Sequence, residues 1–297
     1  MSKTGRIERG RKDLEKANGR GLSPVRTTDK VLAILCADIH LSLRPPRARR
    51  KEADWFDAMA CSLGELTALA NRYEAPILCA GDIFDYWRAE PELINFALNH
   101  LPNMYAIPGQ HDLPLHNIDL IKRSAFWTMV LAEKIEPIIH KTPILIENDI
   151  VVHGFPFGSP ILPFEEQSKK YHIALAHDYF WTDVYHFPGA PKEHEASQYR
   201  SKIKGYFAVA FGDNHKGFST KCKDVSIFNC GGFQRRKSDE IDYRPQVGLI
   251  YNDGSTEPFY LNCEEDIIIK TGSTKQVKND IQLTDFLENL TNLKSSN

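Results

Sequence analysis

The sequence lacks any apolar run close to the roughly 18 residues of a transmembrane helix, and its start lacks the apolar core of a signal peptide. Its six cysteines are scattered and include no C-x-x-C pair. This spacing disfavours a disulfide framework and a structural zinc site, and it favours reduced thiols. We therefore expect a soluble, cytoplasmic protein that has no membrane partner.

The sequence also lacks a strong net charge. The formal net charge is -2 over 297 residues, so no global basic field points to a nucleic-acid partner, which would need a local patch. Apolar, charged and aromatic contents are those of an ordinary globular protein, and no internal repeat is apparent. The length is sufficient for one α/β domain with a large core.

Short apolar runs alternate with amphipathic segments along most of the chain. The expected strands are 34–37, 77–80, 104–107, 144–146, 150–152, 173–176, 208–211 and closing strands within 225–262. The expected helices are 52–73, 90–101 and 119–131. In the first helix, apolar side chains recur every three or four residues, as packing on a sheet requires. This alternation is typical of a layered sheet with right-handed crossovers.

The two ends of the chain differ from the segment 31–262. Residues 1–30 carry nine basic and four acidic side chains, so we expect a flexible arm that is either solvated or in contact with a phosphate backbone. Residues 263–297 form a polar tail with a short amphipathic helix, because leucines and one phenylalanine between 283 and 293 share one helical face. That helix would pack on its own domain or dock on a partner protein.

Carboxylate, imidazole and amide side chains follow five of the expected strands. These residues are Asp38, His40, Asp82, Gln110, His111, His177, Asp213 and His215. In open α/β sheets, the chemistry lies just beyond the carboxyl ends of the strands. A lone Asp there is usually a helix cap and a lone His a buried core residue. Five such strand ends together favour a site for two divalent ions, about 3.5–4 Å apart and bridged by a carboxylate.

Basic and proline-rich loops lie between these strand ends. The loop 44–51 contains Arg47, Arg49 and Arg50, and the turn 234–237 contains Arg235. We identify these four arginines as candidate substrate-binding residues that would steer a polyanion. The segment 155–164 is too rich in proline for regular structure and is interpreted as a lid or a substrate-facing loop.

The order of these motifs resembles that of the calcineurin-like metallophosphoesterases. The family's blocks D-x-H, G-D-x-x-D, G-N-H-D, a later His and G-H-x-H correspond here to Asp38-Ile-His40, Gly81-Asp-Ile-Phe-Asp85, Gly109-Gln-His-Asp112, His177 and Gly212-Asp-Asn-His215. Within that superfamily, these blocks and the G-G-F-x-R-R element at 231–236 are most similar to the Mre11/SbcD DNA-repair nuclease branch. The resemblance covers residues 31 to about 262 and implies an α/β fold, a layered β-sandwich flanked by helices (αββα), without a full capping domain.

The resemblance also implies the roles of the site residues. One metal would be held by Asp38, His40, Asp82 and His215, and the second by Asp82, Gln110, His177 and Asp213. A hydroxide between the two ions would attack the phosphate in line. His111 would face the scissile phosphate as a proton donor or charge stabiliser, and Asp112 would orient it.

Two positions depart from the family pattern. Gln110 replaces the usual Asn, and Asp213 replaces the first His of G-H-x-H. Because a carboxylate is harder and more negative than an imidazole, we expect Mn²⁺, or Mg²⁺, rather than Zn²⁺.

The expected function is that of a DNA nuclease, with an SbcC/Rad50-like ATPase as a possible partner. Tyr86-Trp87 stands where calcineurin-type phosphatases have Arg-Gly, and His111 stands where lipid-linked nucleotide pyrophosphatases have Arg. Both features argue against those relatives. A small-nucleotide or cyclic-nucleotide phosphodiesterase and a non-catalytic scaffold remain as alternatives.

Overall fold

The structure is a computed structural model, and it describes residues 30–139, 142–165 and 170–269. The predicted arm at 1–29 and the predicted amphipathic helix at 283–293 lie outside these residues. Among the described residues, no helix is long and apolar enough to cross a membrane. All six cysteines are described, and none of them forms a disulfide.

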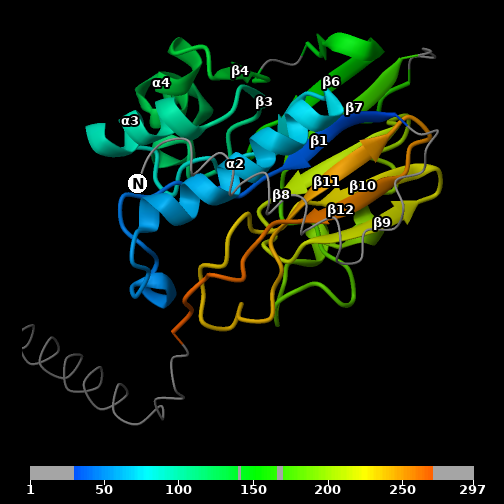
Figure 1. The fold of residues 1–297 in the computed structure, drawn as a ribbon. Helices are drawn as coiled ribbons and strands as arrows, with labels where there is room; N and C mark the ends of the chain where they lie inside the picture. The colour runs from blue at the N-terminus through cyan, green and yellow to red at the C-terminus, as the bar shows by residue number, and fades with distance from the viewer. Residues whose placement is uncertain (1–29, 140–141, 166–169, 270–297) are drawn as a thin grey trace, which may run out of the picture.

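Two six-stranded mixed sheets form the centre of the fold (Figure 1). The first has the order β12-β11-β1-β2-β3-β4 and the second β5-β6-β7-β8-β10-β9. The first sheet contains β1 (Val31–Cys36), β2 (Ile77–Cys79), β3 (Met104–Ala106), β4 (Ile135–Pro137), β11 (Gln246–Tyr251) and β12 (Thr256–Tyr260). The second contains β5 (Ile144–Leu145), β6 (Ile150–Phe155), β7 (Tyr171–His177), β8 (Ala208–Gly212), β9 (Phe218–Cys222) and β10 (Val225–Asn229). The expected layered β-sandwich with flanking helices is therefore confirmed.

Strand β1 is buried on both faces, which explains its continuous apolar sequence. Ile34 and Cys36 contact the core beneath the helices, whereas Leu32 and Leu35 contact the core between the sheets. From the second sheet, Leu175 and Ala210 reach that same inner core. The segment that ends in Asp38 is thus fixed in the middle of the molecule.

Three helices cover the outer face of the first sheet: α2 (Trp55–Tyr73), α3 (Pro91–His100) and α4 (Ala125–Leu131). Helix α2 begins at Asp54, whose side chain accepts a hydrogen bond from the amide of Asp57 at 3.0 Å. The single helix predicted over 119–131 is wrong. A 3₁₀ helix, Ile118–Arg123, ends at Ser124, which has extended backbone angles and caps α4 by accepting a hydrogen bond from Trp127 N.

The outer face of the second sheet has a thinner cover. The four-residue helix α5 (Ala196–Tyr199) and the turns that follow it place Tyr199, Ile203 and Tyr206 on the sheet. Short 3₁₀ helices at Arg47–Arg49, Pro114–His116, Glu147–Asp149 and Lys192–His194 complete the described elements. The predicted hairpin between 144–146 and 150–152 is confirmed as the antiparallel pair β5–β6.

The parallel strands bring the predicted site residues to one edge of the sandwich. Strands β1, β2 and β3 run parallel, as do β7 and β8, where His177 is in register with Gly212. Beyond the strands, the main chain continues to pair, since Asp38 N donates to Gly81 O at 2.9 Å and His40 N donates to Asp82 O at 3.0 Å. The two sheets therefore present their loops to a common site.

Candidate metal centre

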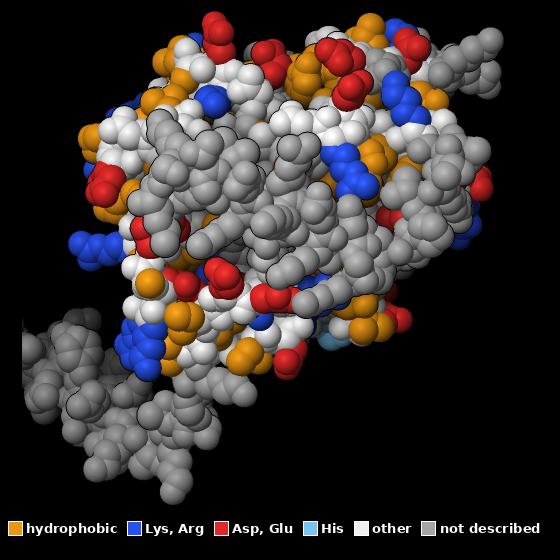
Figure 2. All heavy atoms as spheres, in the orientation of Figure 1, with side chains coloured by type: hydrophobic (Ala, Val, Ile, Leu, Met, Phe, Trp, Pro, Cys, Tyr) orange, Lys and Arg blue, Asp and Glu red, His pale blue; other side chains and the backbone are white. Residues whose placement is uncertain are grey.

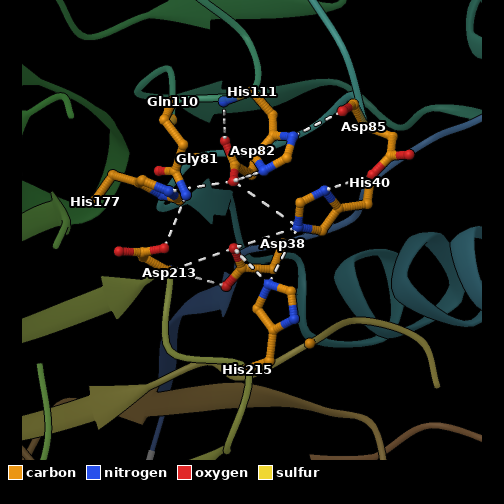
Figure 3. A network of polar contacts seen from close by, with 12 residues as sticks. Asp38, His40, Gly81, Asp82, Asp85, Gln110, His111, His177, Asp213 and His215 are labelled. Atoms are coloured by element: carbon orange, nitrogen blue, oxygen red, sulfur yellow. Dashed lines mark hydrogen bonds and ion pairs between the residues drawn. The ribbon is translucent and has the colours of Figure 1, made fainter. Parts of the chain in front are cut away.

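The first group of ligand atoms joins Asp38, His40 and His215 (Figure 3). The Nε2 atoms of both histidines lie 3.8 Å from Asp38 Oδ1. Asp82 Oδ2 also lies 3.8 Å from His40 Nε2. Two carboxylates and two imidazoles therefore surround one point, as a divalent transition metal requires.

The protonation of the two histidines fits such a cation. His40 Nδ1 lies 3.3 Å from Asp85 Oδ1, and Nε2 is the ring nitrogen that faces Asp38 and His215. The two Nε2 atoms are 3.2 Å apart. Burial lowers the pKa of His40 and lowers that of His215 to about 3. Both rings are thus neutral, and their lone pairs face a position that a cation would stabilise.

The second group joins Asp38, Asp82 and His177, all of them buried. His177 Nδ1 donates a hydrogen bond to Ala80 O at 2.6 Å, so its Nε2 points toward Asp82 Oδ2, 3.4 Å away. Burial alone would lower the pKa of His177, but Asp82 and Asp38 raise it well above its ordinary value. The carboxylates of Asp82 and Asp38 therefore favour a positive charge at this point. A metal ion would supply that charge in place of a proton.

Buried polar atoms without a hydrogen-bond partner provide an independent test of the metal assignment. Asp82 Oδ2, His177 Nε2 and Gln110 Oε1 are three such atoms in the described part of the chain. Leaving such an atom unpaired costs about 1–3 kcal/mol. Two of them, Asp82 Oδ2 and His177 Nε2, lie only 3.4 Å apart, which indicates a missing ligand beside them. The residues present therefore fit divalent ions.

Gln110 and Asp213 hold each other beside this second group. Gln110 Nε2 donates to Asp213 Oδ1 at 2.8 Å, and the backbone amide of Asp213 donates to both carboxylate oxygens of Asp38. Gln110 Oε1 has no hydrogen-bond partner, and its role as a metal ligand stays a prediction. Asp213 belongs to none of the three His and carboxylate groups found among the described residues, so its role as a metal ligand stays a prediction.

Four predicted ligands have left-handed backbone conformations. Their φ angles are 52° for Asp38, 50° for His40, 54° for Asp82 and 79° for Asp213. Such a conformation costs about 1–3 kcal/mol per residue and persists only where the surroundings enforce it. Here the pairing of the loops beyond the strands enforces it and turns the side chains toward one another.

Two motif glycines allow the loops to approach. A Cβ atom on Gly81, whose φ is +100°, would lie 2.4 Å from His177 Nδ1. A Cβ on Gly109 would lie 2.1 Å from Asp82 Oδ1. The glycines of G-D-x-x-D and G-Q-H-D thus make room for the ligands themselves.

Comparison with known families agrees with this geometry. A family model described as calcineurin-like phosphoesterase matches residues 32–217, more than half of the chain. The chain belongs to the calcineurin-like phosphoesterase family. Members of this family use divalent metals and hydrolyse phosphoesters, which is what the two groups of ligand atoms fit. A search of curated protein sequences finds no match.

Several solved structures resemble this phosphoesterase. A Staphylococcus aureus protein described as a 5′-nucleotidase is 12% identical, with a TM-score of 0.47 over 88% of this chain and 58% of its own. The calcineurin-like phosphoesterase YfkN from Bacillus subtilis is 12% identical, with a TM-score of 0.44 over 86% and 97%. An archaeal phosphodiesterase is 12% identical, with a TM-score of 0.39 over 77% and 99%. The chain thus spans less than two thirds of the first of these proteins.

His111 lies at the rim of the phosphoesterase site, but Asp112 does not orient it as predicted. The His111 ring donates from Nδ1 to the carbonyl oxygen of Asp85 at 2.7 Å. The fully buried carboxylate of Asp112 instead accepts hydrogen bonds from the backbone amides of Ile83, Phe84 and Gly109. Burial, followed by the charge of Asp82, raises the pKa of Asp112 to about 7. Asp112 therefore joins the loop after β2 to the loop after β3.

Two of the four predicted substrate-binding arginines have a structural role instead. Arg49 is 2% exposed and donates to Glu52, Asp266 and the carbonyl oxygen of Arg235. Arg235 in turn donates to Asp266 Oδ2 at 2.9 Å. These guanidinium groups bind the chain after β12 to the loop after β1 and cannot reach a substrate. Arg47 and Arg50 are exposed and remain candidates.

Sequence reasoning missed the partners of His40. Arg236 donates to Asp85 Oδ1 at 2.6 Å and to the carbonyl oxygen of His40 at 2.7 Å. Burial alone would raise the pKa of Asp85, but its hydrogen bond with His40 and the charge of Arg236 lower it to about 2. An ionised Asp85 therefore orients the His40 ring. The sequence signal that could have identified these partners is Asp85, the last residue of G-D-x-x-D.

Proposed function

We propose that this phosphoesterase is a two-metal phosphodiesterase that cleaves DNA, as a nuclease of the Mre11/SbcD branch. The observation that carries the proposal is the position of His111. Its side chain is 41% exposed, whereas Asp82, 4.0 Å from its Nε2, is buried. An accessible imidazole beside a buried group of metal-binding atoms is suited to act on a bound phosphodiester.

Each part of the centre has a chemical role in this proposal. Asp38, His40, Asp82 and His215 would hold one ion, and Asp82, His177, Gln110 and Asp213 the other. When bound, the ions supply positive charge to the phosphate and lower the pKa of the attacking water. His111, with Nδ1 fixed by Asp85 O, keeps Nε2 toward the site, where it can give a proton to the leaving oxygen or stabilise its charge.

The charge on the surface near the site favours a polyanionic substrate only in a local region. Acidic and basic side chains are interspersed on the described surface seen in Figure 2. The loop containing Arg47 and Arg50 is tied by Arg49 to Arg235, whose neighbour Arg236 contacts His40. Exposed charge on this loop would therefore lie near a DNA backbone that enters the site.

The experiment that tests the proposal is hydrolysis by the purified protein with Mn²⁺. Single-stranded DNA, double-stranded DNA and bis-p-nitrophenyl phosphate are compared. We expect cleavage of DNA and of the small ester. Cleavage of the ester alone would favour a small-nucleotide or cyclic-nucleotide phosphodiesterase, and turnover of neither would favour a non-catalytic scaffold.

The same assay tests the metal. Because Asp213 adds a carboxylate beside the second ion, we propose Mn²⁺, with Mg²⁺ as the alternative. Activity with Zn²⁺ and none with Mn²⁺ would contradict this assignment.

We also propose an SbcC/Rad50-like ATPase as a partner, through the apolar stripe between Leu283 and Leu293, outside the described residues. Deletion of residues 278–297 should abolish co-purification with such an ATPase while leaving the thermal unfolding of the phosphoesterase unchanged. A deletion that unfolds the domain would show that the stripe packs on its own chain.

A further inference from the structure

Aromatic side chains lie both against the His177 ring and on the loop that follows it. The ring of Phe157, from the loop after β6, lies edge to face with the ring of His177, with 6.5 Å between centroids. Tyr179 follows His177 by two residues, and its ring meets that of Phe187 edge to face at 5.0 Å. Phe187 is 45% exposed. These rings contribute no ligand atom, so the metal centre does not explain them.

The loop that carries two of these rings is attached to the metal centre itself. Asn214, which stands between Asp213 and His215, is 1% exposed and donates from Nδ2 to Phe180 O at 2.9 Å and to Tyr185 O at 3.0 Å. Lys216 Nζ donates to His186 O at 3.0 Å. The segment 178–190 is therefore held at a fixed position relative to the ligands.

Packing accounts for only part of the aromatic surface on this loop. The ring of Tyr185 stacks on Phe218, with 4.7 Å between centroids and 6° between planes. Phe187 contacts Tyr179 at its edge and leaves much of its ring exposed. Neutral ring faces beside a phosphate site are suited to stack a base.

We propose that Tyr179 and Phe187 form a stacking platform for the nucleobase next to the scissile phosphate. The proposal rests on the phosphodiesterase function and narrows its substrate to a phosphodiester with an unpaired base. A base inside a duplex already stacks on its neighbours, so the platform selects single-stranded ends or loops. Base stacking on an aromatic side chain changes affinity by about 5- to 150-fold per base.

The test compares two tetranucleotides that differ only in their bases. One is the thymidine tetranucleotide, and the other has the same backbone with abasic sites. Calorimetric titration of the protein in EDTA gives the ratio of their dissociation constants, and hydrolysis with Mn²⁺ gives the ratio of their kcat/KM values. We expect the wild-type protein to prefer the base-bearing strand by about 5- to 150-fold in both measurements.

Variants of Phe187 separate stacking from apolar contact. Phe187→Leu retains apolar surface but no ring, so it should lose most of the preference in both measurements. Phe187→Tyr retains the ring and should keep the preference. Tyr171→Ala is the matched control, because Tyr171 contacts Phe207 edge to face at 4.9 Å at the opposite end of β7. This control should keep both ratios.

The outcomes distinguish this inference from the proposed function. Hydrolysis of both strands at equal rates, or a preference that Phe187→Leu leaves intact, overturns the platform and leaves the phosphodiesterase standing. A base preference in binding without any turnover supports the platform and overturns the catalytic proposal. Equal binding of the two strands without turnover overturns both the platform and the phosphodiesterase function. The exposed aromatic surface would then be assigned to binding of a protein partner.

Discussion

The two halves of the metal centre both contain Asp38, and Asp82 is the proposed bridge between their ions, but the halves are held in different ways. In the first half, the ring of His40 is oriented by the carboxylate of Asp85, which Arg236 binds in turn. In the second half, His177 is oriented by a main-chain carbonyl group. Gln110 and Asp213, the two further ligands predicted for that half, bind each other.

Both departures from the family pattern concern ligands predicted for the second half, and the two residues bind each other. The amide of Gln110 has two functional ends, a donor that satisfies Asp213 and an acceptor, Oε1, that stays free. A carboxylate at position 213 supplies the acceptor that the amide nitrogen needs. The two substitutions thus act as one pair, whereas the first half depends on charged partners outside its ligands.

The largest effect is expected from Asp82, the proposed bridge between the two ions. Asp82→Asn keeps an oxygen to accept the His111 amide, which donates to Asp82 Oδ1 at 2.9 Å, but it removes the negative charge between the ions. Hydrolysis of bis-p-nitrophenyl phosphate should fall by more than about 100-fold, beyond the effect of losing an outer partner of a ligand. Steady-state kinetics measures this fall.

Asp224→Asn serves as the control, because Asp224 is exposed in the turn between β9 and β10. It should retain wild-type activity. If Asp82→Asn retained activity within a few-fold, the proposed sharing of Asp82 by the two ions would be wrong.

The next largest effect on activity is expected from variants that remove one ligand from a single half of the metal centre. His215→Asn removes a ligand from the first half, and His177→Asn removes one from the second. Because each half retains other ligands, each variant should lose one bound Mn²⁺ per chain, and both should lose most of their activity. Calorimetric titration of the metal-free proteins with Mn²⁺ counts the ions. Loss of both ions in either single variant would show that the halves do not bind independently.

The sequence predicted the ligands because they follow strands whose apolar character is plain. Asp38 and His40 end a run that is buried on both faces, and Asp82 ends another. Parallel strands bring such ends together whatever the loops between them do. The candidate ligands were therefore recognisable without knowledge of any side-chain contact.

The contacts around those ligands depend on pairings that local sequence does not contain. Arg49 lies in a basic loop, but its partner Asp266 is 217 positions away, so its burial was not predictable. The same holds for Arg236, which reaches His40 across 196 positions. The break between the 3₁₀ helix and α4 was different, because Ser124 is a local helix-capping signal that the apolar periodicity obscured.

A smaller effect is expected from the outer partner of the first half. Asp85→Asn retains the size of the side chain and an acceptor for Arg236, but it loses the charge that orients the His40 ring. Mn²⁺ affinity of the first half should fall by about 10- to 100-fold. Titration in the His177→Asn background isolates this half. An unchanged affinity would mean that the backbone alone orients His40, as it does His177.

The smallest effect, and the sharpest test of the comparison, comes from restoring the family pattern in the second half. The double variant Gln110→Asn with Asp213→His replaces the paired amide and carboxylate by a shorter amide and an imidazole. Because an imidazole suits Zn²⁺ better than a carboxylate does, the ratio of activity with Zn²⁺ to activity with Mn²⁺ should rise by about tenfold, similar to other changes around a metal. Each single variant leaves one partner unpaired and should lose activity with both metals. Equal behaviour of the single and double variants would show that the two positions are not coupled, and the difference between the halves would then have another origin.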